Sequence, residues 1–205
     1  MKQRSYVKKP IKVAITGKIG TGKTTLCNLL KKEGFQVFES DNEVSKLLER
    51  KDIKNKVCNL FSKKINLLLD ENDNLNKSVL GDFLFSNKTE LKKIEKILYP
   101  FLEIEKEKFT KKNLAKKIIF FDIPLLFEKK LHKDFDKIIY LRVNKEIQKQ
   151  RVLKRIGMNE KKLKKILLNQ SYNLSYFKKF ITLEIETSKK KSFIKQKLKI
   201  FINTF

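Results

Sequence analysis

The chain has 205 residues, 40% of them hydrophobic and 16 of them phenylalanine. This is enough to fill the core of one sizeable domain, and it excludes a chain that is disordered throughout. Uninterrupted apolar runs such as Ile118–Phe121 are too short for a transmembrane helix of about 20 apolar residues, and no signal-peptide core follows the basic start. Cys27 and Cys58 provide neither a disulfide framework nor a metal-binding spacing, so we expect a cytoplasmic protein with no membrane partner.

A formal net charge of +26 is typical of a protein with a polyanionic partner, such as nucleic acid or a phosphate-rich small molecule. Only five of the 49 basic residues are arginine, however, and the lysines are scattered through amphipathic patterns, as a compositional bias would scatter them. The chain has no basic stripe interleaved with stacking aromatics, and no zinc-finger or RNP-type signature. We therefore expect no specific nucleic-acid partner.

Short β-rich runs alternate with amphipathic segments along the chain. The predicted strands lie at residues 11–16, 36–38, 117–123, 137–143 and 182–186. Helices are predicted at 24–32, after Asp41, and at 144–156, 160–168 and 192–202. Most of 53–115 is also predicted to be helical, with a polar loop at 70–74 and a new helix that begins at Pro100. Strands that alternate with helices indicate an α/β fold with a largely parallel sheet.

A phosphate-binding loop follows the first predicted strand. Residues 17–24 read G-K-I-G-T-G-K-T and match G-x-x-x-x-G-K-[ST] at every defined position. Glycines let the backbone turn tightly so that its N–H groups face phosphate oxygens, and the following helix adds the positive end of its dipole. In such a loop Lys23 reaches the β- and γ-phosphates of a nucleotide, and the Thr24 hydroxyl can ligate Mg²⁺.

The same loop occurs in GTPases, which also carry N-K-x-D and D-x-x-G motifs. The near match at residues 87–90 lies in a polar helical stretch and not after a buried strand, and no D-x-x-G follows the loop. We therefore set the GTPase interpretation aside.

Two carboxylates stand at the ends of predicted strands, where ligands of open α/β sheets bind. Asp41 follows the second strand, where it can accept the proton of an attacking hydroxyl or simply cap the next helix; the local sequence favours neither. Asp122 ends the third strand, a position from which a carboxylate holds Mg²⁺ directly or through water. An unusual apolar segment, P-L-L-F-E at residues 124–128, follows it.

The loop, the segment E-S-D-N-E-V at 39–44 and D-I-P-L-L-F-E at 122–128 together resemble the dephospho-coenzyme A kinase family, and the similarity runs through most of the chain in the same order. The D-x-P-L-L-F-E string is the specific part of this resemblance. It implies transfer of the γ-phosphoryl group of ATP to the ribose 3′-hydroxyl of dephospho-CoA, the last step of coenzyme A synthesis. The implied protein is a phosphotransferase with an alcohol acceptor, which uses ATP and Mg²⁺.

The resemblance also implies the division of the chain. A three-layer αβα P-loop core with a five-stranded parallel sheet would comprise about 1–40, 116–150 and 182–205. A helical acceptor-binding insertion would span about 41–115, and a small lid about 151–181.

The resemblance assigns catalytic roles to Lys23, Asp41, Arg151 and Arg155. The nucleotide-binding set is Gly17, Gly20, Thr21, Gly22, Lys23, Thr24 and Thr25, and the metal-binding pair is Thr24 and Asp122. Arg151 and Arg155 are four residues apart, which predicts a shared helix face. They are two of only five arginines, and in so lysine-rich a chain the pair fits either planar, bidentate phosphate contacts or an ordinary solvated basic face; the resemblance favours the phosphate contacts.

The chain departs from the family pattern at several positions. Lys18 stands where a second glycine is usual, and we expect its side chain to face solvent; Tyr99 replaces a histidine, and Glu186-Thr187 replaces Asp-Asn. After Gln170 the usual Lys/Arg and Ala-Asp pattern is missing. Three alternatives stay open: another nucleoside- or nucleotide-type P-loop kinase, a basic P-loop protein that acts on RNA, and, because of the departures in the lid, a paralogue that binds its ligands without turning them over.

Overall fold

The computed structural model describes residues 9–205, which divide into two compact units. The sheet unit comprises the described residues up to Phe38 together with Thr110–Phe205, and the helical unit comprises Glu39–Phe109. We describe each unit by itself.

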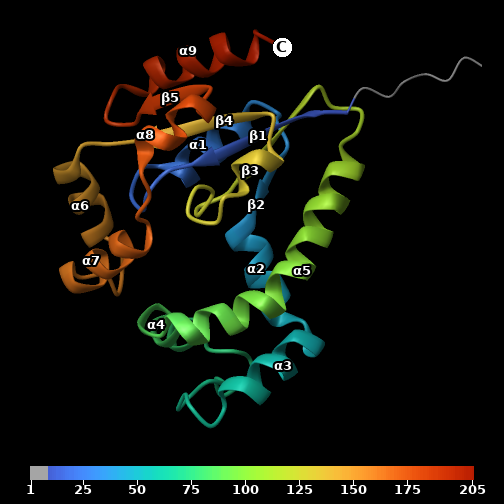
Figure 1. Ribbon diagram of the computed structural model, residues 1–205, viewed down its shortest axis with the longest axis vertical. Coiled ribbons are helices and arrows are strands. Elements are labelled where there is room, and N and C mark those ends of the chain that lie inside the picture. Colours follow the sequence, from blue (N-terminus) through green and yellow to red (C-terminus); the bar gives the residue numbers. More distant parts are fainter. Residues whose placement is uncertain (1–8) are drawn as a thin grey trace, which may run out of the picture. The chain divides into compact units, whose positions relative to one another are not determined.

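The centre of the sheet unit is a five-stranded sheet in the order β2-β3-β1-β4-β5 (Figure 1). Its strands are β1 (Ile11–Thr16), β2 (Val37–Glu39), β3 (Ile118–Asp122), β4 (Lys137–Arg142) and β5 (Leu183–Glu186). Strand β1 runs parallel to both β3 and β4, and β4 runs parallel to β5. The predicted α/β fold with a parallel sheet is confirmed, and the observed strand ends differ from the predicted ones by no more than one residue.

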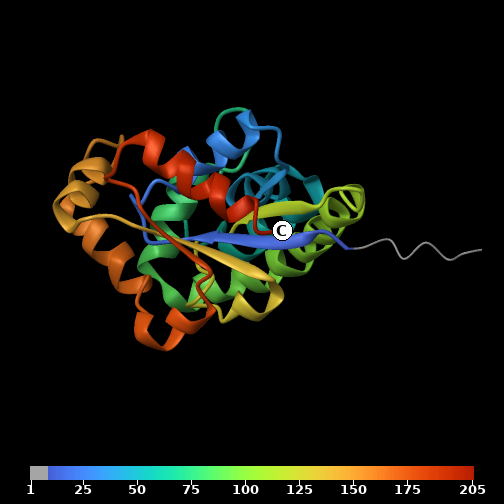
Figure 2. The ribbon, with the colours of Figure 1, turned by 90° about the horizontal axis from the view of Figure 1, so that it is seen from above.

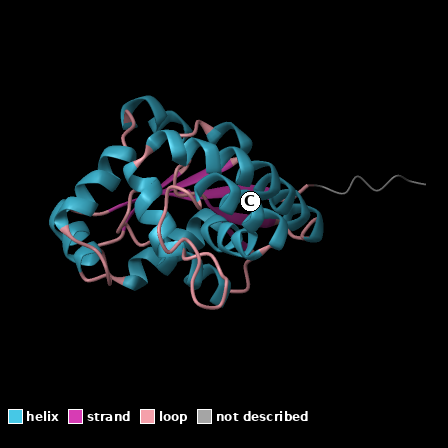
Figure 3. Ribbon diagram, turned by 90° about the horizontal axis from the view of Figure 1, so that it is seen from below, coloured by secondary structure: helices cyan, strands magenta, loops and turns pink. Residues whose placement is uncertain are grey.

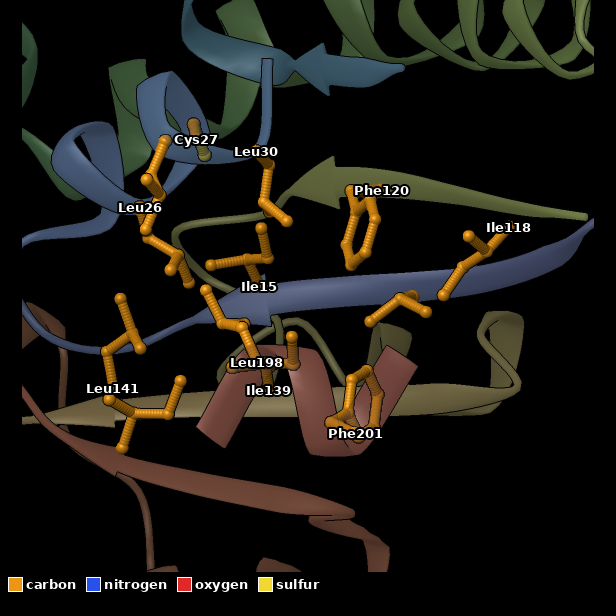
Figure 4. Close-up of a cluster of buried hydrophobic side chains, with 13 residues drawn as sticks. Ile15, Leu26, Cys27, Leu30, Ile118, Phe120, Ile139, Leu141, Leu198 and Phe201 are labelled. Atoms are coloured by element: carbon orange, nitrogen blue, oxygen red, sulfur yellow. The ribbon is translucent and has the colours of Figure 1, made fainter. Parts of the chain in front are cut away.

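One face of the sheet packs against helices α1 (Lys23–Lys32) and α9 (Lys191–Ile202). Successive side chains of a strand point to opposite faces, so alternate residues of β1, β3 and β4 reach these helices. Figure 2 shows α9, in red, alongside the strands, and the close-up in Figure 4 shows the side chains that meet between them. This buried cluster comprises Val13, Ile15, Leu26, Cys27, Leu29, Leu30, Ile118, Phe120, Ile139, Leu141, Ile185, Leu198 and Phe201.

Aromatic side chains cover the other face of the sheet. The ring of Phe121 in β3 lies 5.3 Å from that of Phe135, and the ring of Tyr140 in β4 lies 6.1 Å from that of Phe127. Phe127 in turn stacks on Phe177 of α8 (Leu174–Phe177) at 4.6 Å. A sheet with apolar residues on both faces needs both faces covered, and the predicted three-layer arrangement is confirmed.

Two further helices of the sheet unit begin at asparagine caps. The side chain of Asn144 accepts a hydrogen bond from the Glu146 N–H at the start of α6 (Lys145–Leu153), and Asn159 accepts one from the Lys162 N–H at the start of α7 (Glu160–Asn169). Short 3₁₀ helices lie at Leu131–Asp134 and Lys178–Phe180. Figure 3 separates the strands, in magenta, from the cyan helices that make up much of the remaining chain.

The helical unit contains four helices within the described residues, α5 running past the boundary into the sheet unit. They are α2 (Ser40–Glu49), α3 (Lys51–Phe61), α4 (Lys77–Ser86) and α5 (Lys88–Lys112). The predicted polar loop is formed by a turn in which Asp70 Oδ1 accepts hydrogen bonds from the N–H groups of Asn72 and Asn74 at 3.0 and 2.8 Å. In residues 9–205, no helix combines the length and apolar composition that a membrane span requires.

Two expectations about helix starts are wrong. Pro100 does not open a new helix but lies inside α5, where its ring is exposed while Leu98 and Leu102 on either side are buried. Proline has no backbone N–H and so removes one helical hydrogen bond, but the packing of Leu98 and Leu102 keeps the helix continuous. Asp41 is not the N-cap of α2, because the helix already begins at Ser40; the carboxylate instead lies in the first turn, where the helix dipole favours a negative charge.

The cluster beneath α1 and α9 predicts a clear stability difference between two isoleucines. Ile139 is fully buried in β4, whereas Ile200 of α9 is 61% exposed. We expect Ile139→Ala to lower the free energy of unfolding by about 2–5 kcal/mol, because it removes buried methyl groups and leaves a cavity. The matched control Ile200→Ala should change it by less than about 0.5 kcal/mol. Denaturant unfolding of both variants measures these values, and equal losses would contradict the assigned core.

Candidate active site

The phosphate loop connects β1 to α1 and leaves no room for side chains at two of its glycines. A Cβ atom on Gly17 would lie 2.4 Å from the carbonyl oxygen of Leu141 in β4, and one on Gly20 would lie 2.7 Å from Cγ2 of Val152. Both glycines also have positive φ angles, of 150° and 79°. The loop therefore needs glycine for its backbone conformation and for its close approach to β4 and α6.

The start of α1 is suited to an anion. Its N-cap, Gly22, is left-handed and supplies no side-chain cap, and the first turn, all of it within the described chain, carries no acidic residue. The first N–H groups of the helix and the positive end of its dipole thus face the loop, and no carboxylate in the helix's own first turn neutralises them.

The Lys23 ammonium lies over the loop. Its Nζ donates hydrogen bonds to the carbonyl oxygens of Gly17 at 2.7 Å and Lys18 at 3.3 Å. The Lys18 carbonyl also accepts a hydrogen bond from the Thr21 hydroxyl at 2.8 Å. These bonds hold the positive charge at the mouth of the loop. A bound phosphate would replace the two carbonyl oxygens as the hydrogen-bond acceptor of the Lys23 ammonium.

The Lys18 side chain does not simply face solvent, as its variable position suggested. It is half-buried, and its Nζ lies 5.7 Å from the centre of the Tyr172 ring, within reach of a cation–π interaction. Glu128, at the end of the apolar segment after β3, shares this neighbourhood. Burial raises the pKa of Glu128, and the positive charges of Lys18 and Lys23 act in the opposite direction.

The apolar segment itself is explained by packing. Leu126 and Phe127 are fully buried, with Phe127 at the centre of an aromatic cluster that includes Tyr172 and Phe177. Hydrophobic residues therefore occupy a place where a surface loop would be polar, and they hold Glu128 beside the lysines of the loop.

A cavity of about 260 Å³ opens beside the phosphate loop within the sheet unit. Apolar side chains from α1, β4 and α9 line part of it, and polar groups line the rest. Its lining residues are Gly20, Gly22, Thr25, Leu26, Leu29, Leu141, Arg151, Arg155, Thr187, Lys191 and Ile194. A largely apolar cavity with a few polar groups next to a phosphate site has the character of a site for a nucleotide base.

Arg151 binds Thr187 at one wall of this cavity. Its Nη1 donates to the Thr187 hydroxyl and its Nη2 to the Thr187 carbonyl oxygen, both at 3.0 Å. This forked contact joins α6 to the residue that follows β5. Thr187 also lies under Gly22, whose Cβ position is 3.7 Å from the threonine side chain.

The prediction that Arg151 and Arg155 share a helix face is wrong, because α6 ends at Leu153. The Arg155 N–H bonds to the Val152 carbonyl three residues back, so the chain tightens into a turn before Arg155. Both arginines nevertheless line the same cavity.

Asp122 is buried at the carboxyl end of β3. It pairs in register with Ile15 of β1, two residues before the loop begins, and the next N–H, that of Ile123, bonds to the Ile15 carbonyl at 3.0 Å. Thr24 lies in the first turn of α1. Within the described part of the chain, no cluster of three or more His, Cys, Asp or Glu side chains is arranged to hold a metal. A hydroxyl and one carboxylate fit Mg²⁺ when substrate phosphates and water supply the other oxygen ligands.

Asp41 belongs to the helical unit, where it is exposed in the first turn of α2. The other predicted site residues belong to the sheet unit. The role of Asp41 as a general base therefore stays a prediction.

Several residues at this site were not predicted from the sequence. Gln148 and Gln170 both bind the backbone of Ile19 in the phosphate loop, and Lys191 and Ile194 line the cavity. No motif marks any of them, because each comes to the site from a part of the chain that is distant from the loop in sequence.

Comparison with known proteins identifies the family. The family described as CoaE, dephospho-CoA kinase, matches residues 11–176. The dephospho-CoA kinase of Fusobacterium nucleatum is 33% identical over 167 residues, which cover 82% of this chain and 84% of that protein. The chain belongs to the dephospho-CoA kinase family.

Solved structures show the same fold. The crystal structure of TT1252 from Thermus thermophilus matches with a TM-score of 0.78 at 24% sequence identity, and the match covers 97% of this chain and 99% of TT1252. The dephospho-CoA kinase from Campylobacter jejuni matches with a TM-score of 0.64 at 21% sequence identity, and the match covers 94% of this chain and 96% of that protein. The α/β fold that the strand pattern predicted, and the three-layer P-loop fold that the family resemblance implied, are thereby confirmed.

The close approach of Gly17 to β4 can be separated from its backbone strain by comparison with Gly34. Gly34 also has a positive φ angle, 86°, but a Cβ there would meet no atom within 4 Å. Gly34→Ala should therefore lower the free energy of unfolding only by the backbone cost of about 1–2 kcal/mol. Gly17→Ala should lower it by more, because the Leu141 carbonyl cannot move without breaking the sheet. Equal losses in denaturant unfolding would contradict the contact.

Proposed function

We propose that this chain transfers the γ-phosphoryl group of ATP to the ribose 3′-hydroxyl of dephospho-CoA, producing coenzyme A in the last step of its synthesis. Membership of the dephospho-CoA kinase family supports the choice of acceptor. The observation that carries the proposal is the phosphate loop with Lys23 over its mouth, next to a cavity suited to a base. We propose the cytoplasm as the place of action.

In the proposed complex, the adenine base occupies the cavity and the phosphates lie along the loop and the start of α1. Gly17, Gly20, Thr21, Gly22 and Thr25 shape this surface, and Lys23 transfers its hydrogen bonds from loop carbonyls to phosphate oxygens. The ammonium charge then stabilises the negative charge that builds up on the transferred group.

Thr24 and Asp122 are the residues that we propose to hold Mg²⁺ together with the phosphates. Bound there, Mg²⁺ would neutralise charge on the β- and γ-phosphate oxygens. The burial of Asp122 beside the loop strand supports its part in this site, since a buried carboxylate is favourable when it faces a cation.

The remaining roles concern the acceptor and the lid. We propose that Asp41 accepts the proton of the attacking 3′-hydroxyl, that the helical insertion at about 41–115 binds the acceptor, and that residues 151–181 form the lid. Arg151 and Arg155 would bring guanidinium groups to the nucleotide, and their shared cavity supports this.

The acceptor is tested by ADP release from the purified chain with ATP and Mg²⁺. Dephospho-CoA should stimulate release strongly, whereas a panel of nucleosides and nucleotides, and separately RNA, should not. Stimulation by one of the other acceptors would assign the chain to a different kinase activity. Stimulation of ADP release by RNA alone would favour a P-loop protein that acts on RNA through its basic surface.

Loss of the proposed base should act on turnover and not on nucleotide binding. Asp41→Asn keeps the shape of the side chain but cannot accept a proton, so we expect kcat to fall by about 10²–10⁴-fold with little change in ATP affinity. The control Asp134→Asn changes an exposed carboxylate in a 3₁₀ helix of the sheet unit and should leave kcat unchanged. An unchanged kcat in Asp41→Asn would remove the general-base role.

The cavity arginines should not tolerate lysine. A lysine at Arg151 cannot reproduce the two contacts with Thr187, and we expect Arg151→Lys and Arg155→Lys each to lower kcat/KM for ATP by about tenfold or more, or about 1.4 kcal/mol. Arg142 of β4 is exposed and forms ion pairs with Glu184 and Glu186, but it does not line the cavity. Arg142→Lys should therefore keep the wild-type kcat/KM for ATP. Wild-type kinetics in both cavity variants would show that these arginines supply surface charge only.

A further inference from the structure

Both peptide groups that flank Ile19, the third residue of the phosphate loop, are held by glutamine side chains. The Ile19 N–H donates to Oε1 of Gln170, and its carbonyl oxygen accepts from Nε2 of Gln148, both at 2.7 Å. Gln148 lies on α6 and Gln170 directly after α7, and both are buried. Two segments more than a hundred residues away in sequence thus meet at one loop residue.

The backbone determines the orientation of both amides. An N–H group can only donate, so it must face the oxygen of Gln170, and a carbonyl can only accept, so it must face the NH₂ group of Gln148. If the Gln170 amide were flipped, its NH₂ group would face the Ile19 N–H, and if the Gln148 amide were flipped, its oxygen would face the Ile19 carbonyl. Gln170 therefore acts as the acceptor and Gln148 as the donor.

These bonds orient the neighbouring groups of the loop. The carbonyl and N–H of a trans peptide point in opposite directions, so the peptide whose carbonyl faces Gln148 directs the Gly20 N–H away from α6. The other peptide directs the Lys18 carbonyl away from Gln170, toward Thr21 and Lys23, which bond to it. Gly20 is also packed tightly on Gln148, since a Cβ there would lie 3.2 Å from its carbonyl oxygen.

We propose that Gln148 and Gln170 are positioning residues that set the peptide planes of the phosphate loop, so that the Gly20 N–H is oriented for a nucleotide phosphate before the nucleotide binds. The proposal rests on the proposed function only in taking ATP as the ligand. It couples the loop to both ends of the segment that carries Arg151 and Arg155, because Gln148 precedes these arginines and Gln170 follows them.

The different roles of the two glutamines allow a sharp test. Gln170→Glu keeps an oxygen that accepts the Ile19 N–H, whereas Gln148→Glu loses the donor and places an acceptor against the Ile19 carbonyl. Both variants bring one negative charge next to the same residue, so the difference between them isolates the hydrogen bond. Gln150→Glu, an exposed glutamine on α6, is the matched control for a charge on that helix.

The measurement is the dissociation constant of MgATP by calorimetry at pH 8, without dephospho-CoA. We expect Gln148→Glu to bind ATP at least tenfold more weakly than Gln170→Glu, Gln150→Glu to bind like the wild type, and adenosine to bind all four proteins equally. Equal ATP affinities for Gln148→Glu and Gln170→Glu, or an equal loss of adenosine binding, would overturn the proposal.

If Gln148→Glu does not fold, Gln148→Met against Gln150→Met measures the same bond without a charge. At least tenfold weaker ATP binding in the first supports the proposal, and equal binding overturns it. A wild-type chain that binds ATP but does not phosphorylate dephospho-CoA would refute the proposed function and leave this test intact.

Discussion

The contact on which the site depends is the one between the first loop glycine and strand β4. Gly17 lies so close to the Leu141 carbonyl that no side chain fits, and this is possible because β1 lies between β3 and β4 in the sheet. The same strand order brings Asp122 to the position opposite Ile15, next to the loop. The cluster beneath α1 and α9 holds these strands in place, and hence the loop that leaves β1.

The nucleotide site is assembled around this loop from segments far apart in the sequence. Gln148 and Arg151 come from α6, Gln170 follows α7, and Thr187 follows β5. Their contacts with the loop and with one another are hydrogen bonds between partly or fully buried groups, which are costly to leave unpaired. The loop is therefore shaped by the protein before a phosphate arrives, and binding need not provide that ordering.

The sequence predicted the strands well because each is a short β-rich run between turn-forming residues, and it predicted the loop because the glycine spacing and GKT follow from the geometry of phosphate binding. It failed at Pro100, where packing of Leu98 and Leu102 overrides the local tendency of proline to begin a helix. It also failed at Arg155, where a tight turn ends α6 early. Gln148 and Gln170 had no local signal, since a buried glutamine is recognised only by its distant partner.

The central claim, that the loop is ordered by its glutamine partners before nucleotide binds, can be tested by the amide NMR signals of Ile19 and Gly20 in the free and ATP-bound protein. The account predicts that the Ile19 amide, bonded to Gln170, is protected from hydrogen exchange in the free protein and shifts little on ATP binding, while the Gly20 amide shifts strongly. An Ile19 amide that exchanges freely until ATP is added would contradict it.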